Sequence, residues 1–259
     1  MKAVGKFSRY GGAWVVLVLA FAATFGAVSA HESGKDTDWP RWRGANHDAT
    51  ALERGVLDFD TGQGLKLVWK KPLGSGYSSI SIADGRAFTM FSDKTNDYAI
   101  AFDAGSGEEL WRFEIGETYK GHDGSHDGPI STPLVANERV YGLGPNGELF
   151  ALDVATGSKL WLTHLVADQQ AKAPFYGFAT SPILEGDVLV VETGGEGRTI
   201  SGFNKDTGER LWSTGSDTVN YQSPIALDVD GETHLLCVGD KYIYGLEPQT
   251  GKLLWEYRH

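Results

Sequence analysis

Cysteine is almost absent from this 259-residue chain, which contains only Cys237. A single thiol excludes any disulfide within the chain. Its apolar surroundings in the segment HLLCV (234–238) predict a small buried residue. Because no cysteine follows the apolar segment near the amino terminus, we also expect no lipid anchor.

Basic residues are scarce as well, with 23 Lys and Arg against 34 Asp and Glu. Three of the basic residues, Lys2, Lys6 and Arg9, precede a short apolar run at 13–25. That run is short for a membrane span, and the small residues at 28–30 are typical of a cleavage site. The pattern predicts a signal peptide over 1–30.

Cleavage before His31 would deliver the protein to the periplasm or the outside of the cell. An uncleaved signal that anchors the chain in the membrane is the alternative. After cleavage the chain carries 20 basic and 34 acidic residues, a net charge of −14. This acidity argues against nucleic acid and anionic lipid as partners.

One segment recurs along the chain, and it is built from alternating apolar and polar residues, a glycine turn and a tryptophan. The copies are AIAFDAGSGEELW (99–111), LFALDVATGSKLW (149–161), ISGFNKDTGERLW (200–212) and IYGLEPQTGKLLW (243–255). Each copy predicts a strand, a tight turn and a second strand. A weaker copy ends at Trp69, and the five tryptophans are 42, 50, 51 and 43 residues apart. A period of this length made only of strands indicates a β-propeller with four-stranded blades.

The tryptophans of this repeat are suited to docking between neighbouring blades. Each offers a large apolar face and one N–H donor for a backbone carbonyl. The residues expected in this role are Trp69, Trp111, Trp161, Trp212 and Trp255. A repeat requires the same residue in every blade, so the motif indicates a fold and does not by itself indicate an activity.

The pattern A-x-D-x-x-T-G-x-x-x-W, nearly complete at 151–161, resembles the tryptophan-docking repeat of the pyrroloquinoline-quinone (PQQ)-like propellers. That superfamily includes the propeller lipoprotein of the outer-membrane assembly machinery and, more distantly, quinoprotein alcohol dehydrogenases. The resemblance covers about 65–259 and implies an all-β propeller, usually of seven or eight blades.

The strands that follow an N-terminal arm (31–64) form four predicted blades and one extra strand. The blades span 79–113, 131–163, 180–213 and 223–257, and the extra strand spans 65–70. The last blade already has its own outer strand, so the extra strand has no partners. We therefore predict an incomplete ring over 65–259, whose open faces would bind missing blades or a second copy.

The connections from each outer strand to the next inner strand should emerge on one face, where propellers commonly hold ligands. One of them contains His122, Asp123, His126 and Asp127 within the segment GHDGSHDGP. These side chains could hold a divalent ion, as a metal site or as a structural module, or provide a general base. Alternatively, the Asp and Gly residues form turns while the histidines line the channel mouth.

Aromatic residues recur in the same connections. Tyr77, Tyr176, Phe178 and Tyr221 could stack on a planar ligand or an extended peptide, or they could fill space between loops. The segment WPRWRG (39–44) leaves a similar choice between a cation–π platform and packing of the arm on the propeller.

The resemblance to quinoproteins implies PQQ bound with Ca²⁺ or a lanthanide, an Asp base and a vicinal Cys-Cys disulfide. This chain has no such cysteine pair, and no catalytic residue is assigned. We therefore expect an exported, non-catalytic binding or scaffold propeller whose loop face recognises a protein, a peptide or a carbohydrate. A PQQ- or metal-dependent oxidoreductase is the alternative.

Overall fold

The computed structural model describes residues 38–51 and 66–259, whose regular secondary structure consists of antiparallel β-strands. The predicted signal peptide and much of the arm, with Leu65, lie outside the described residues. Over the two described ranges, no helix has the length and apolar character that crossing a bilayer requires.

The strands form four sheets of four strands, each in sequence order, which we call blades 1 to 4. Blades 1 and 2 contain β1 (Ser81–Ala83), β2 (Arg86–Ser92), β3 (Asn96–Asp103), β4 (Glu109–Glu117), β5 (Leu134–Ala136), β6 (Arg139–Leu143), β7 (Glu148–Asp153) and β8 (Lys159–His164). Blades 3 and 4 contain β9 (Ile183–Glu185), β10 (Val188–Glu192), β11 (Ile200–Asn204), β12 (Arg210–Thr214), β13 (Ile225–Val229), β14 (Glu232–Val238), β15 (Tyr242–Leu246) and β16 (Leu253–Arg258). The propeller-type fold predicted from the repeat is confirmed.

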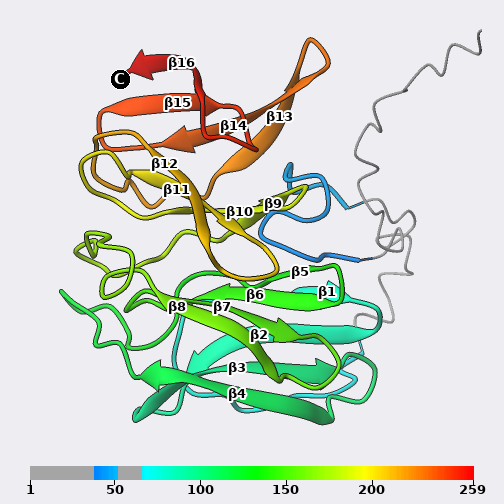
Figure 1. Ribbon diagram of the computed structural model, residues 1–259. Coiled ribbons are helices and arrows are strands. Elements are labelled where there is room, and N and C mark those ends of the chain that lie inside the picture. Colours follow the sequence, from blue (N-terminus) through cyan, green and yellow to red (C-terminus); the bar gives the residue numbers. More distant parts are fainter. Residues whose placement is uncertain (1–37, 52–65) are drawn as a thin grey trace, which may run out of the picture. The chain divides into compact units, whose positions relative to one another are not determined.

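Successive blades pack face to face, in the order of the chain (Figure 1). One apolar core lies between blades 1 and 2 and includes Phe88 and Phe150, and a second lies between blades 2 and 3 and includes Tyr141 and Phe203. A third core between blades 3 and 4 contains Cys237, which is a fully buried free thiol, as predicted.

Four tryptophans each dock on the turn between the third and fourth strands of the blade that follows them in the chain. Their Nε1 atoms donate to backbone carbonyls: Trp69 to Ala104 (2.9 Å), Trp111 to Val154 (3.0 Å), Trp161 to Lys205 (2.9 Å) and Trp212 to Pro248 (3.2 Å). In each turn a glycine with positive φ lies under the indole ring, where a Cβ would collide with it. The repeated glycine therefore serves both the turn and the close approach of the tryptophan.

Trp255 differs from the other four, since its Nε1 donates to His234 Nδ1 within blade 4 at 3.0 Å. The extra strand predicted at 65–70 is not observed in its described part, because residues 66–70 form no regular secondary structure. A strand needs a hydrogen-bonded neighbour, and the described residues provide none for this segment. Trp69 nevertheless docks on blade 1 without it.

The described part of the arm, residues 38–51, contacts the innermost strands. Trp39 exchanges two backbone hydrogen bonds with Ile82 of β1, each 2.8 Å long, and the Pro40 carbonyl accepts from Val135 N of β5 at 2.8 Å. Arg41 is buried, and its Nη1 lies 2.6 Å from His47 Nε2. In the described residues the cation–π contacts are made by Arg112, on Phe91 and Tyr98, and not by the arginines of the arm. Trp39 and Pro40 of the arm therefore pack on the blades.

Candidate functional site

Three long connections between blades meet on one side of the molecule, which we call the loop face. They are 118–133 after β4, 165–182 after β8 and 215–224 after β12, and they appear at the left of Figure 1. Ring contacts, and hydrogen bonds between tyrosine hydroxyls and the backbone, join each connection to the next.

The His-Asp segment of the first connection is a compact turn held by its own polar groups. Asp127 accepts from Gly121 N at 3.0 Å and pairs with Lys120 Nζ at 2.9 Å, and His122 N donates to Ser125 Oγ at 2.9 Å. The hydrogen bond from Lys120 lowers the pKa of the Asp127 carboxyl, which therefore stays ionised. Asp127 thus closes the loop.

The predicted metal ligands are not brought together. In the described parts of the chain, no group of three or more His, Cys, Asp and Glu side chains is placed to hold a metal ion. Three of the four predicted ligands have other partners, while Asp123 lies exposed in a turn with a φ of 52°. The ring of His122 packs on Phe175 at 5.1 Å between centroids, the ring of His126 packs on Tyr77 at 5.9 Å, and Asp127 pairs with Lys120.

An aromatic ridge crosses the three connections and consists of Tyr119, His122, Phe175, Tyr176 and Tyr221. Successive ring centroids are 5.8, 5.1, 4.9 and 5.9 Å apart. Tyr176 N donates to Tyr221 Oη at 2.9 Å, which fixes one connection to the next. Because Phe175, Tyr176 and Tyr221 remain 64, 42 and 37% exposed, the ridge presents open aromatic surface.

Phe178 is the exception among the predicted aromatic residues. It is 1% exposed and belongs to the core between blades 2 and 3. Its ring fills space between blades and offers no face to a ligand. Alternation along a loop does not reveal which of two neighbouring aromatic residues points inward.

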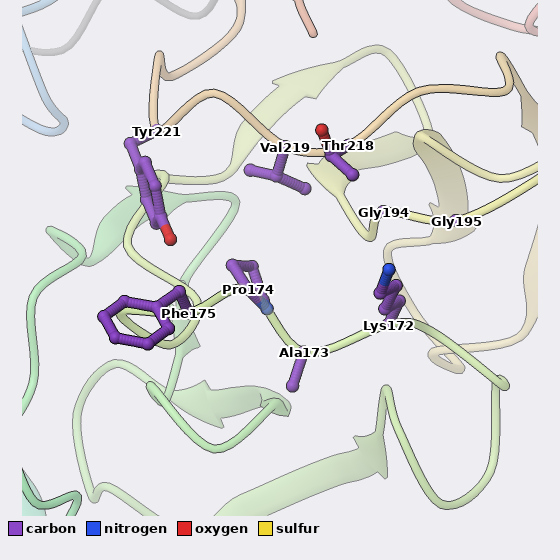
Figure 2. A pocket seen from close by; sticks show the side chains of 9 residues that line it. All are labelled: Lys172, Ala173, Pro174, Phe175, Gly194, Gly195, Thr218, Val219 and Tyr221. Atoms are coloured by element: carbon purple, nitrogen blue, oxygen red, sulfur yellow. The ribbon is translucent and has the colours of Figure 1, made fainter. Parts of the chain in front are cut away.

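A side cavity of about 420 Å³ lies beside the ridge, and Figure 2 shows the rings of Phe175 and Tyr221 at one end and Lys172 at the other. It is lined by Lys172, Ala173, Pro174, Phe175, Gly194, Gly195, Thr218, Val219 and Tyr221. Lys172 is the single charged residue of this lining.

An inner cavity of about 480 Å³ also borders Tyr221, beside the segments that precede the innermost strands. It is lined by Trp42, Tyr77, Ser125, Ile130, Thr132, Tyr176, Ala179, Ser181, Tyr221, Gln222 and Ser223. These residues come from the arm, from all three connections and from the segment before β1. The predicted ligand residues Tyr77, Tyr176 and Tyr221 therefore share one cavity.

Hydroxyl groups link the blades along the wall of the inner cavity. Ser79 N donates to Thr132 Oγ1 (3.3 Å), Thr132 N to Ser181 Oγ (2.9 Å) and Ser181 N to Ser223 Oγ (2.9 Å). Each of these hydroxyl residues is followed by a proline, and β5, β9 and β13 begin one residue later. Proline cannot donate in a ladder, so the neighbouring hydroxyl supplies the link between blades.

The residues around the inner cavity do not fit PQQ with its metal ion. PQQ has three carboxylates, and the eleven lining residues contain no basic side chain. Nor do the described residues contain a cluster of acidic ligands for Ca²⁺. Burying carboxylates without cations is unfavourable.

Three aromatic residues besides the predicted ligand residues contribute to the loop face. Trp42 of the arm lines the inner cavity, and Tyr119 and Phe175 belong to the ridge. The available signal was the aromatic content of the arm and of these loops.

Comparison with known proteins places this fold in a family. The family model described as outer membrane protein assembly factor BamB matches residues 95–258. Among curated proteins, BamB of Burkholderia pseudomallei is 26% identical over 214 residues, covering 81% of this chain and 50% of that protein. Quinohemoprotein alcohol dehydrogenase ADH IIB of Pseudomonas putida is 29% identical over 232 residues, covering 68% of this chain and 32% of that protein.

Solved structures share the fold at low identity. The quinohemoprotein alcohol dehydrogenase from Comamonas testosteroni has a TM-score of 0.67 and 18% identity, covering 86% of this chain and 41% of that one. BamB from Moraxella catarrhalis has a TM-score of 0.51 and 17% identity, covering 73% and 51%. The chain therefore spans about half or less of the length of these relatives. Since the family model matches more than half of its residues, the chain belongs to the PQQ-like β-propeller repeat family described as outer membrane protein assembly factor BamB.

Proposed function

We propose that this chain is an exported, non-catalytic binding or scaffold propeller that recognises a protein, a peptide or a carbohydrate on its loop face. The observation that carries the proposal is the aromatic ridge, which exposes Phe175, Tyr176 and Tyr221 while backbone and ring contacts hold them in place. Exposed aromatic surface rimmed by polar groups is typical of interaction sites.

The relatives support the proposal in general terms, since two of the curated proteins are assembly factors by name. The lining of the inner cavity supports it as well, because its aromatic rings and hydroxyl groups can pack against a ligand and form hydrogen bonds with it.

Site-specific photo-crosslinking in living cells of the source organism tests this function. A photoreactive phenylalanine analogue replaces Phe175 on the ridge or, as the control, Ala155 in the exposed turn between β7 and β8. That turn lies at the other end of β8 from the loop face. We expect a discrete crosslinked species from position 175 alone. Equal labelling from both positions, or none from either, contradicts the proposal.

Export is part of the proposal and rests on the sequence of residues 1–30. We expect amino-terminal sequencing of the protein from a periplasmic or secreted fraction to begin at His31. A protein that keeps Met1, or one found in the cytoplasm, would show that this segment is not a cleaved signal.

A PQQ-dependent oxidoreductase is the second candidate, favoured by the 29% identity to a quinohemoprotein alcohol dehydrogenase. The test is absorbance of the purified protein with added PQQ and Ca²⁺, followed by dye-linked oxidation of alcohols. A bound quinone spectrum together with dye reduction would replace the non-catalytic proposal.

A further inference from the structure

The inner cavity contains an unusual set of hydroxyl groups. Seven of its eleven lining residues carry a hydroxyl, and six of those hydroxyls accept a hydrogen bond from a backbone N–H. The six acceptors are Tyr77, Ser125, Thr132, Ser181, Tyr221 and Ser223.

A hydroxyl that accepts one hydrogen bond still has a proton to donate. In the described part of the chain, none of these six protons is donated to a protein acceptor. The backbone N–H bonds fix the oxygen positions, with distances of 2.9 Å at Tyr77 and Tyr221 and 2.9 Å at Ser181 and Ser223. The cavity therefore presents a preorganised set of donors, and its complement is a ligand rich in oxygen acceptors.

The charge of the site decides which acceptor-rich ligand fits. None of the lining residues is acidic or basic, so a carboxylate or phosphate would lose its hydration without gaining an ion pair. The whole chain has a formal charge of −11, which also repels anions. A neutral ligand avoids both costs.

Aromatic rings supply the remaining surface. Trp42 is 46% exposed and lines the cavity with Tyr77 and Tyr176. Flat rings offer apolar faces, and the Gln222 amide adds both a donor and an acceptor. The volume of about 480 Å³ lies within the range of about 300–1,000 Å³ usual for small-molecule sites.

We propose that the inner cavity is a binding site for a neutral saccharide. The hydroxyls donate to the sugar oxygens, and the aromatic rings pack against the apolar C–H face of the sugar ring. This inference rests on the proposed binding function of the loop face and specifies one ligand class for it.

Calorimetric titration of the purified full chain tests the site. The probes are neutral trisaccharides of glucose and of N-acetylglucosamine, an anionic trigalacturonate and an uncharged, end-blocked tripeptide. We expect saturable binding of at least one neutral trisaccharide and none of trigalacturonate or the tripeptide. Preferential binding of trigalacturonate or of the tripeptide would overturn the proposal.

Variants that remove single hydroxyls make the test specific. Thr132→Val and Tyr221→Phe should each weaken binding of the neutral trisaccharide by about 3- to 10-fold, as expected for one lost hydrogen bond. Tyr257→Phe on β16, which is 63% exposed, is the matched control and should bind like the wild type. Equal affinity in all four proteins, with unfolding midpoints unchanged, would overturn the proposal.

Failure of the saccharide site is distinguishable from failure of the proposed function. If no neutral saccharide binds up to millimolar concentration while position 175 still yields a discrete crosslink, the saccharide proposal is wrong and the loop-face function stands. If neither binding nor crosslinking occurs, both are wrong.

Discussion

The buried carboxyl group of Asp97 is hydrogen-bonded to the backbone of the loop face. It is 1% exposed, and its Oδ2 accepts from Tyr119 N at 3.1 Å, directly beneath the aromatic ridge. Burial raises the pKa of Asp97 to about 6, and the nearby carboxylates of Glu148 and Asp127 act in the same direction. Burial also raises the pKa of Glu148.

The raised pKa of Asp97 makes folding stability depend on pH. The folded state binds this proton more tightly than the unfolded chain, so ionised Asp97 is unfavourable above pH 6 and the cost disappears as the pH falls toward 4. Asp97→Asn removes this titration. The unfolding free energy of the variant, relative to wild type, should therefore rise by about 2–3 kcal/mol from pH 4 to pH 7. Urea denaturation at several pH values measures it.

Asp103→Asn is the control with the opposite sign. Hydrogen bonds from the Ser106 side chain and backbone lower the pKa of the exposed Asp103 carboxyl, so its stabilisation is lost as the pH falls. The stability of this variant relative to wild type should fall as the pH rises. Parallel pH profiles for Asp97→Asn and wild type would show that Asp97 does not titrate as a buried group.

At the scale of the structural element, the turn between the third and fourth strands of a blade joins two blades. Gly208 has φ of +71°, and a Cβ there would lie 2.6 Å from the Trp161 ring of the previous blade. Gly231 in the turn between β13 and β14 also has positive φ, at +84°, but a Cβ there would meet nothing within 4 Å. Alanine substitutions at these two glycines therefore distinguish the cost of the backbone conformation from the cost of displacing the tryptophan ring.

Gly208→Ala should therefore be more destabilising than Gly231→Ala. Both substitutions carry the cost of a left-handed conformation, about 1 kcal/mol, but only Gly208→Ala also displaces the indole, for a total of about 2–4 kcal/mol. Chemical denaturation of the two variants gives the comparison. Equal losses would mean that the Trp161 contact contributes nothing beyond turn geometry.

Sequence patterns predicted the strands well wherever residues close in the sequence determine the structure. Alternation and the flanking turns predict strands over 139–143, 148–153, 188–192 and 242–246, and β6, β7, β10 and β15 have these bounds. The inner strands begin later than expected, as at β5, where Thr132 and Pro133 form the link between blades. The ridge and the burial of Phe178 depend on contacts between loops more than 40 residues apart in sequence, which alternation does not encode.

On the scale of the whole molecule, blade 4 leaves open a sheet face whose counterpart in each earlier blade is covered by the next blade. In blade 4, Gly245 lies between its two strand partners Leu236 and Trp255. In blade 3, Gly202 lies in the same way between Val190 and Trp212. Val190 is fully buried, whereas Leu236 is only partly buried and Trp255 is 36% exposed. In the described residues no turn docks on Trp255, whose Nε1 bonds to His234 instead.

This open face should make the 259-residue chain self-associate unless further blades cover it. Leu253 and Tyr257 of β16 are 43 and 63% exposed beside Trp255, and burial of such apolar surface favours association. Sedimentation velocity should show a concentration-dependent increase in mass for wild type, and Leu253→Lys with Tyr257→Lys should abolish it. Leu160→Lys is the matched control, since Leu160 is 47% exposed on β8 but lies away from blade 4, and it should associate like wild type. A wild-type protein that stays monomeric at every concentration would show that blade 4 needs no cover.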